Sequence, residues 1–372
     1  MPMKTRAAVV YEPGKPIVIE ELDVDDPGPG EVLIKFLYAG LCHSDLHITT
    51  GDMQARLPMV LGHEGAGVIE KVGPGVTRVA EGDHVVCSFI PSCGKCRYCS
   101  TGRQSICDMG ATILEGYLPG ERFPLTGPKG DYGAMCMLGT FSQYSVIHEN
   151  SCVPVDGDLP LDKAVLVGCG VPTGWGSAVN SAKVRPGDTA VVIGVGGIGI
   201  NAVQGARYAG AKNVIAIDPL ENKREKALEL GATHAFATAG EAMEAVTELT
   251  RGQMADAAIL TVGLMTSEVV SEGFNIVGKD GNVVLTGLNK LDMDNIQLPG
   301  SILTLFRKKI IGSLFGDCNP MTDIPRILGL YQAGDLKLDE LITQTYTLDE
   351  VNEGYADLEA GKNVRGIIVH EH

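Results

Sequence analysis

The sequence predicts an α/β protein of two domains, one mostly β and one built on a doubly wound parallel sheet. The chain has 372 residues, too many for one hydrophobic core of ordinary size. Its first third consists of short β-rich runs separated by proline and glycine, as in the PGPG at 27–30. From about residue 175, apolar strands alternate with helical segments, which is the pattern of a parallel sheet covered by helices.

The β-rich runs of the first third are RAAVVY, PIVIEE, EVLIKFLYAG and GAGVIEKVG. The stretch from about 110 to 140 is rich in glycine and proline, and we expect a loop there. The end of the chain returns to mixed character, and because chain termini often lie near each other we expect it to rejoin the first domain. The predicted division is 1–170 with 312–372 for the mostly-β domain, and 171–311 for the sheet domain.

In the sheet domain, TAVVIG at 189–194 is a continuous apolar strand, followed by a small-residue helix that stops at Gly210. NVIAID is the next strand, and the charged helix ENKREKALEL after it ends at Gly231. Further strand candidates are HAFA, ADAAILTV, GNVVLTG and KKIIGSLF.

The segment GVGGIG, Gly194 to Gly199, joins the first of these strands to its helix. Gly194 permits a tight turn, Gly196 lets the backbone approach a pyrophosphate, and Gly199 lets helix and strand pack closely. The helix N-terminus offers N–H groups to phosphates. Asp218 ends the next strand, where a carboxylate binds the ribose hydroxyls and repels a 2′-phosphate, so the pattern predicts a Rossmann-type domain that binds NAD. The alternative is a glycine-rich turn that binds nothing.

Four cysteines lie at the spacing C-x2-C-x2-C-x7-C in a short lobe at 93–107: Cys93, Cys96, Cys99 and Cys107. A closed set of four thiolates predicts a structural zinc ion with no position left for substrate. The alternative is a pair of disulfides or a redox motif. The N-terminus has no apolar run long enough for a signal peptide, which favours a cytoplasmic location, where thiols stay reduced.

Composition argues against two classes of partner. The 46 acidic and 30 basic residues give a formal net charge of -16, which repels the phosphate backbone of nucleic acids and anionic membranes. No stretch approaches the length of a membrane span.

A second metal site has candidates but no decisive spacing. GLCHSDLH contains Cys42, GHEGAG contains His63, and VGCG contains Cys169. Taken singly, a buried cysteine is usually a small core residue and a histidine usually a satisfied polar group.

The same motifs, with CGKCRYCSTGRQSIC, GCGVPTGWGSAV and VGGIG, resemble the zinc-dependent medium-chain alcohol dehydrogenases over essentially the full length of the chain. The resemblance implies a GroES-like catalytic domain, a Rossmann domain that binds NAD(H), and two zinc ions per subunit. It implies that Cys42, His63 and Cys169 hold the catalytic zinc and leave one position open.

The resemblance implies oxidation of an alcohol to an aldehyde, or the reverse, by hydride transfer to NAD. Zinc lowers the pKa of the alcohol so that an alkoxide forms. Ser44 then passes the proton through the nicotinamide ribose to His47. The alternatives are that Ser44 caps a helix and that His47 is a surface group. Asp45 and Glu64 are implied to orient His63 and tune the metal charge, although as lone acids they would be surface charges.

Further positions match family residues around the cofactor and substrate. His43 replaces an arginine found in many relatives near the pyrophosphate, and Arg365 matches an arginine that reaches it. Lys223 matches a lysine near the adenosine ribose. The alternative is that Arg365 and Lys223 are solvated surface charges. Thr173 and Ile198 match positions that pack on the nicotinamide ring. Phe89 matches a position in the substrate pocket, and the alternative for Phe89 is plain core packing.

The segment KKIIGSLFG resembles the strand through which family subunits pair, so we expect a homodimer or homotetramer. The loop at 110–140 and the Asp218-Pro219 pair resemble the nicotinoprotein alcohol dehydrogenases. These keep NAD bound and use external acceptors such as N,N-dimethyl-4-nitrosoaniline (NDMA). Two alternatives remain: a thiol-linked formaldehyde dehydrogenase, for which Arg56, Arg103 and Arg122 are available cations, and a non-catalytic protein that binds NAD or zinc.

Overall fold

The computed structural model describes residues 3–288 and 296–372, which divide into two compact units. The first unit contains the described residues up to Cys169 together with Asn319–His372, and the second contains Gly170–Cys318. No helix within the described ranges is both long and apolar enough to cross a membrane.

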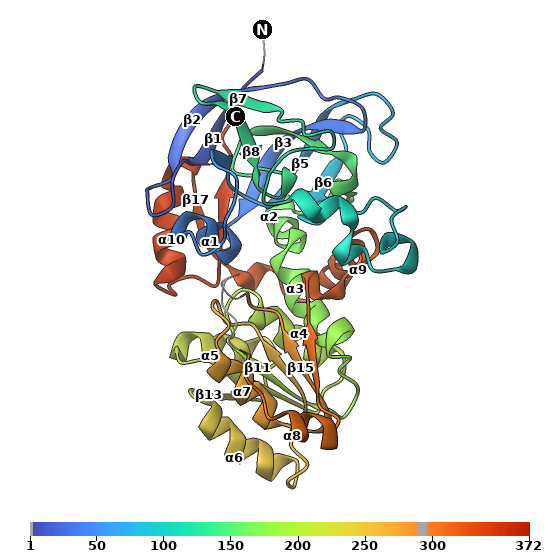
Figure 1. Ribbon diagram of the computed structural model, residues 1–372, viewed down its shortest axis with the longest axis vertical. Coiled ribbons are helices and arrows are strands. Elements are labelled where there is room, and N and C mark those ends of the chain that lie inside the picture. Colours follow the sequence, from blue (N-terminus) through green and yellow to red (C-terminus); the bar gives the residue numbers. More distant parts are fainter. Residues whose placement is uncertain (1–2, 289–295) are drawn as a thin grey trace. The chain divides into compact units, whose positions relative to one another are not determined.

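The first unit contains a closed barrel and a seven-stranded sheet (Figure 1). The barrel strands, in spatial order, are β1 (Met3–Val10), β2 (Val18–Val24), β7 (Leu125–Gly127), β8 (Gly130–Ala134) and β4 (Met59–Val60). The sheet has the order β10 (Cys152–Pro154), β6 (His84–Cys87), β5 (Glu64–Val72), β3 (Glu31–Gly40), β18 (Arg365–Val369) and β17 (Ile342–Tyr346), and β9 (Tyr144–His148) also pairs with β3.

The expectation of a loop at 110–140 is wrong in part, because β7 and β8 form a hairpin there. Leu125 and Tyr132 pair across the hairpin and are fully buried in the barrel core with Leu22. Strands of three and five residues carry too little alternation to stand out from a glycine- and proline-rich sequence.

The helices of the first unit are α1 (His43–Thr50), α2 (Leu161–Ala164), α9 (Pro320–Ala333) and α10 (Val351–Glu359). The C-terminal segment returns to the first unit through β18, which pairs antiparallel with β3 so that Ile367 lies opposite Gly40. Two residues after Gly40 the chain reaches Cys42. The C-terminal strand therefore lies beside the segment that carries a candidate metal ligand.

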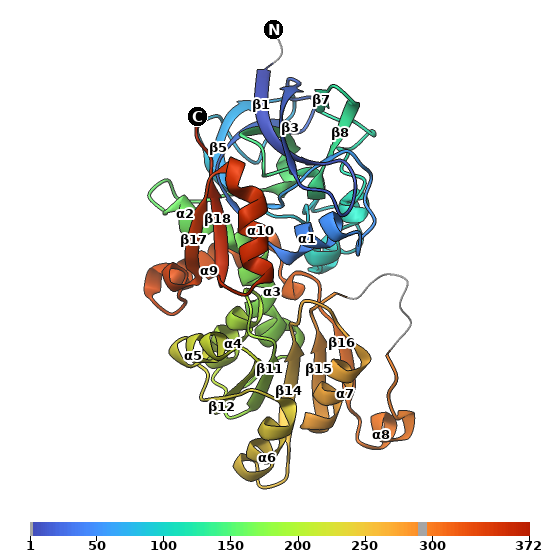
Figure 2. The same ribbon diagram turned by 90° about the vertical axis from the view of Figure 1, so that its left-hand side faces the viewer.

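The second unit is a six-stranded sheet whose neighbouring strands are all parallel. In spatial order the strands are β13 (His234–Phe236), β12 (Asn213–Ile217), β11 (Thr189–Ile193), β14 (Ala255–Leu260), β15 (Val277–Leu285) and β16 (Lys309–Gly312). The helices, seen around the sheet in Figure 2, are α3 (Gly170–Gly176), α4 (Gly199–Tyr208), α5 (Glu221–Glu229), α6 (Ala239–Leu249), α7 (Ser267–Ile276) and α8 (Gly300–Leu305).

Both faces of this sheet are covered, which explains its continuous apolar strands. Val191 and Ile193 of β11 pack in a cluster with residues of α6 and α7, such as Val246. The intervening Val192 points to the opposite face and is also fully buried. The predicted doubly wound parallel sheet is therefore confirmed.

The segment 312–318 lies in the second unit, whereas the sequence-based division assigned it to the first. Strand β16 pairs with β15, and the backbone N–H of Ser313 then donates to the carbonyl of Leu285. The thiol of Cys318 donates to the carbonyl of Pro172 in α3. These contacts keep the chain with the second unit until Asn319.

Helices α3 and α4 pack closely, and this closeness gives a test of the fold. A Cβ atom at Gly205 of α4 would lie 2.7 Å from the carbonyl oxygen of Trp175, whereas one at Gly329 of α9 would meet nothing within 4 Å. We expect Gly205→Ala to lower the free energy of unfolding by about 1–3 kcal/mol, as overpacking does. We expect Gly329→Ala to raise it by about 0.5–1 kcal/mol, because alanine favours the helix.

Urea unfolding of both variants measures the difference. Equal effects of the two substitutions would contradict the close packing of α3 on α4.

Candidate metal centre and cofactor site

Three segments of the first unit bring four candidate metal ligands together. Cys42 precedes α1, His63 and Glu64 lie at the start of β5, and Cys169 follows the 3-10 helix η6 (Val165–Gly168). Their ligand atoms all lie within 4.8 Å of one another, and all four residues are buried. The family resemblance implied that Glu64 orients His63 and tunes the metal charge, but the structure places the Glu64 carboxylate within the ligand cluster.

The donor set fits a zinc ion. His63 Nε2 is buried and has no hydrogen-bond partner among the described residues, which is costly unless a cation or proton donor satisfies it. Two thiols and one imidazole are ligands that zinc prefers. The Cys169 side chain lowers the pKa of the Cys42 thiol well below its ordinary value, so the cluster favours one thiolate before any metal binds.

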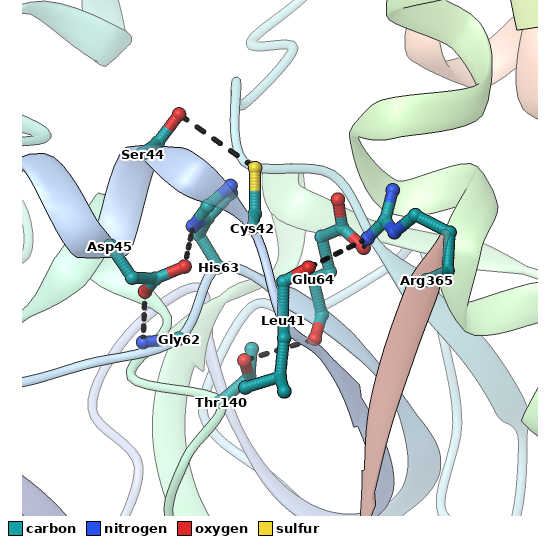
Figure 3. Close-up of polar contacts among 9 residues, drawn as sticks. All are labelled: Leu41, Cys42, Ser44, Asp45, Gly62, His63, Glu64, Thr140 and Arg365. Carbon is teal, nitrogen blue, oxygen red and sulfur yellow. Dashed lines mark hydrogen bonds and ion pairs between the residues drawn. The ribbon is translucent and has the colours of Figure 1, made fainter. Parts of the chain in front are cut away.

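Asp45 fixes the orientation of the His63 ring (Figure 3). One carboxylate oxygen, Oδ1, accepts from the backbone N–H of Gly62 at 2.7 Å, and Oδ2 lies 3.1 Å from His63 Nδ1. Both side chains are buried. Because Nδ1 faces Asp45, Nε2 is the ring nitrogen left for a metal, which is the arrangement that a carboxylate partner of a zinc-binding histidine produces.

Glu64 and Arg365 form a buried ion pair. Burial raises the pKa of Glu64 to about 7, against the opposing effect of the Arg365 guanidinium. Arg365 also donates to the carbonyl of Leu41 at 3.3 Å, and Thr140 donates to the carbonyl of Glu64 at 3.0 Å (Figure 3). The structure thus places Arg365 behind the ligand cluster, and its expected contact with a pyrophosphate stays a prediction.

Ser44 and His47 lie one turn apart on α1, so they share one face of the helix. The N-cap residue of α1 is Cys42, so Ser44 does not cap the helix; its hydroxyl lies 3.8 Å from the Cys42 sulfur. His47 is not a solvated surface group, because its side chain is only 16% exposed and its Nδ1 lies 3.6 Å from an oxygen of Asp52. His43 is exposed at the first position of the helix.

Phe89 packs against the ligand cluster. Its ring meets the His63 ring edge-on, with 5.9 Å between the centroids. The sequence assigned Phe89 to a substrate pocket or to the core, and the structure places it beside the candidate metal ligand.

The cysteine lobe also has the geometry of a zinc site. The sulfur of Cys93 lies 3.9 Å from that of Cys99, and the sulfur of Cys96 lies 4.0 Å from that of Cys107. A tetrahedral ion with zinc–sulfur bonds of about 2.3 Å separates its sulfurs by about 3.8 Å. Backbone N–H groups of Cys96 and Cys99 donate to the preceding cysteine sulfurs at 3.3 and 3.4 Å. All ten cysteines are free thiols, so the disulfide alternative does not apply.

In the second unit, the glycine turn leaves room for a phosphate. Gly194 has φ of 85° and a Cβ atom at Gly199 would collide with the Gly194 carbonyl, so both positions require glycine. A Cβ atom at Gly196 would meet only the ammonium of Lys223, at 4.0 Å. The backbone here is therefore approachable by a ligand, with one cation nearby.

Three other predicted cofactor contacts lie around this turn. Gly197 accepts through its carbonyl from the Asn201 side chain at 2.9 Å. Ile198 is the N-cap residue of α4, and Thr173 is buried in α3. Their contacts with a nicotinamide ring stay predictions.

Asp218 has a second role that sequence analysis missed. Its Oδ2 accepts from the N–H of Val195 at 2.9 Å, and its Oδ1 accepts from the N–H of Leu220 at 3.0 Å. Each carboxylate oxygen keeps a further lone pair for a ribose hydroxyl. The acid at the end of β12 therefore holds the glycine turn in place, and its expected contact with a ribose stays a prediction.

Comparison with known proteins decides the family. The model of the alcohol dehydrogenase GroES-like domain matches residues 28–157, and the model of the zinc-binding dehydrogenases matches residues 197–332. The NDMA-dependent alcohol dehydrogenase of Amycolatopsis methanolica is 62% identical over 368 residues, which cover 99% of each chain. The chain belongs to the zinc-binding alcohol dehydrogenase family.

Solved structures of this family have the same fold. An alcohol dehydrogenase zinc-binding domain protein from Burkholderia ambifaria superposes with a TM-score of 0.93 at 33% identity and covers all of both chains. Benzyl alcohol dehydrogenase from Acinetobacter calcoaceticus superposes with a TM-score of 0.92 at 32% identity, over 99% of this chain and 100% of that one. The predicted α/β class, with a GroES-like domain and a Rossmann-type sheet, is confirmed, and the chain is an oxidoreductase rather than a non-catalytic binding protein.

The lobe geometry predicts the effect of removing one sulfur. We expect Cys107→Ser to lower the zinc content by one ion per chain and to lower the thermal midpoint, because the three remaining thiols cannot close the site. Cys152→Ser is the matched control, since Cys152 is buried in β10 outside both clusters. Metal analysis of both variants measures the zinc content per chain. An unchanged zinc content in Cys107→Ser would refute a metal site in the lobe.

The position of Asp218 predicts a change in nucleotide preference. A carboxylate next to a 2′-phosphate costs several kcal/mol, so Asp218→Asn should improve binding of NADP relative to NAD by at least about tenfold. Calorimetric titration of nucleotide-free protein with each dinucleotide measures the ratio. If the ratio stays at the wild-type value, Asp218 does not face the ribose.

Proposed function

We propose that the chain oxidises an alcohol to its aldehyde, or reduces the aldehyde, with NAD(H) as hydride carrier and with zinc held by Cys42, His63 and Cys169. The buried, unpartnered Nε2 of His63 beside two thiols is the observation that carries the proposal. Zinc bound there would supply a Lewis acid that lowers the pKa of an alcohol hydroxyl. Glu64, the fourth candidate ligand, forms an ion pair with Arg365, which leaves a three-ligand set with the open position expected of a catalytic zinc.

The proton of the alcohol leaves through α1. Ser44 lies next to Cys42, and His47 lies one turn further along the same face of the helix. Imidazole is the side chain best suited to proton transfer near neutral pH, and an oxygen of Asp52 lies 3.6 Å from His47 Nδ1. Ser44 is the group that accepts the proton, and His47 is the group that delivers it to solvent.

The cofactor stays bound between turnovers in this proposal. The relative that is 62% identical over nearly the whole chain is named for its dependence on NDMA, which supports the nicotinoprotein mode for this chain as well. An external electron acceptor then reoxidises the bound NADH in place. Asp218, which both holds the glycine turn and faces the ribose, favours NAD over NADP.

The substrate is a simple alcohol or aldehyde rather than a thiol adduct. A thiol-linked formaldehyde dehydrogenase needs cations for the carboxylates of its thiol, but the three candidates are engaged elsewhere. Arg56 lies over the Phe123 ring, with 4.1 Å from its guanidinium carbon to the centroid. Arg103 lies over the Tyr98 ring of the cysteine lobe. Arg122 forms ion pairs with Glu31 and Asp25.

Subunits pair through the second unit. Strand β16 is the last strand of its sheet, and exposed apolar residues precede and follow it in sequence. Leu305 is 74% exposed, and Phe306 and Leu314 are also exposed. An edge strand with apolar neighbours supports a homodimer or homotetramer. The free thiols support a cytoplasmic location.

The central experiment measures what the purified protein contains and what it needs. Denaturation should release two zinc ions and one NAD(H) per chain, and the native protein should oxidise a primary alcohol with NDMA as acceptor without added NAD. Cys42→Ser should lower kcat/KM by about a thousandfold, as expected when several kcal/mol of Lewis-acid stabilisation are lost. Cys152→Ser should keep the wild-type rate.

Each part of the proposal can fail separately. A nucleotide-free protein that turns over only with added NAD would refute the permanently bound cofactor. A zinc-free preparation with full activity would refute the metal mechanism.

A further inference from the structure

Helix α10 approaches the ligand cluster closely. It lies beside α1 in both Figure 1 and Figure 2. A Cβ atom at Gly354 of α10 would lie 2.6 Å from a methyl carbon of Leu41, the residue before Cys42. The absence of a side chain at Gly354 therefore lets the helix reach the segment that carries the first ligand. The next residue of the helix is Tyr355.

Tyr355 presents a buried hydroxyl in this region. The residue is only 4% exposed, and its ring packs against that of the fully buried Phe141, with 6.2 Å between the centroids. Within residues 3–288 and 296–372, its hydroxyl oxygen is shielded from solvent and has no hydrogen bond of good geometry, and the same is true of Asp45 Oδ2 and His63 Nδ1. Buried polar atoms are satisfied in nearly all native structures, so each of these three atoms calls for a partner.

The donors and acceptors can be matched. Asp45 Oδ1 accepts from Gly62, and Oδ2 lies 3.1 Å from the His63 ring and keeps a second lone pair. Tyr355 belongs to the same packed region, since a Cβ atom at Gly62 would lie 2.6 Å from a carbon of the Phe141 ring against which Tyr355 packs. Burial, and then the charge of the Asp45 carboxylate, raise the pKa of Tyr355 well above its ordinary value, so the hydroxyl keeps its proton.

We propose that Tyr355 is a positioning residue that donates a hydrogen bond to Asp45 and thereby holds His63 in the orientation that binds zinc. This inference rests on the proposed function, which places zinc at Cys42, His63 and Cys169. An Asp45 carboxylate with three donors, from Gly62, His63 and Tyr355, has no freedom to rotate. The His63 ring then keeps Nε2 directed at the two thiols. Mutation of a hydrogen-bond partner of this kind typically lowers metal affinity by 10- to 100-fold.

The test removes the hydroxyl and keeps the ring. In Tyr355→Phe the phenyl group still packs on Phe141, and the catalytic zinc should pass to a chelator about tenfold faster than in the wild type, while the lobe zinc is released at the wild-type rate. Tyr132→Phe is the matched control: Tyr132 is a buried barrel tyrosine whose hydroxyl bonds Tyr11 and Glu20. It should release both zinc ions as the wild type does.

Cobalt substitution gives a second signal that general destabilisation would not move. With Co²⁺ in the catalytic site, Tyr355→Phe should shift the visible absorption bands of the metal, and Tyr132→Phe should leave them unchanged. Wild-type bands and wild-type zinc release in Tyr355→Phe would overturn the proposal.

A double-mutant comparison tests the route through Asp45. In an Asp45→Asn background, Tyr355→Phe should change zinc release less than about twofold, because the acceptor of its hydrogen bond is already altered. Additive effects would overturn the proposed route. A wild-type protein that holds no zinc at this cluster would refute the proposed function itself, whereas zinc-loaded wild type with an unaffected Tyr355→Phe variant refutes only the role of Tyr355.

Discussion

The first unit is built around one buried cluster of charged and titratable side chains. Cys42, His63, Glu64 and Arg365 all lie out of water, and each needs a partner because an isolated buried charge is strongly unfavourable. Asp45 lies beside Nδ1 of His63, and Arg365 forms an ion pair with Glu64. Within the described part of the chain, no group forms a hydrogen bond with His63 Nε2, which lies beside two thiols. A cation would satisfy this nitrogen.

This constraint involves residues far apart in the sequence. Arg365 stands at the start of β18, and β18 pairs with the strand that leads to Cys42. Helix α10 packs on the same segment, where Gly354 lies against the side chain of Leu41. Residues near the C-terminus therefore complete a site whose first ligands lie among the first 65 residues. Removing the C-terminal segment would leave Glu64 without its counter-charge.

The sequence predicted those features that depend on local pattern. The parallel strands, the glycine turn and the four-cysteine lobe follow from apolar runs, glycine spacing and ligand spacing. The ligands Cys42, His63 and Cys169 had no decisive spacing, and only the resemblance to a family singled them out. The barrel strands β7 and β8 were missed because they are too short to show alternation.

Side-chain partners across long sequence separations could not be predicted. Nothing near Arg365 in the sequence indicates that it pairs with Glu64, and Asp218 gives no sign that it accepts from Val195. The sequence pattern indicates only that Tyr355 is one apolar position of an amphipathic helix. The position of its side chain near the site follows from the packing of α10 beside α1. In each case the relevant signal is tertiary packing, which a periodic pattern does not contain.

An anomalous difference map recorded at the zinc absorption edge on crystals of the native protein would test the central claim most directly. The account predicts two peaks per chain, one among the four sulfurs of the lobe and one bounded by the sulfurs of Cys42 and Cys169 and by His63 Nε2. A single peak, confined to the lobe of an active protein, would contradict it.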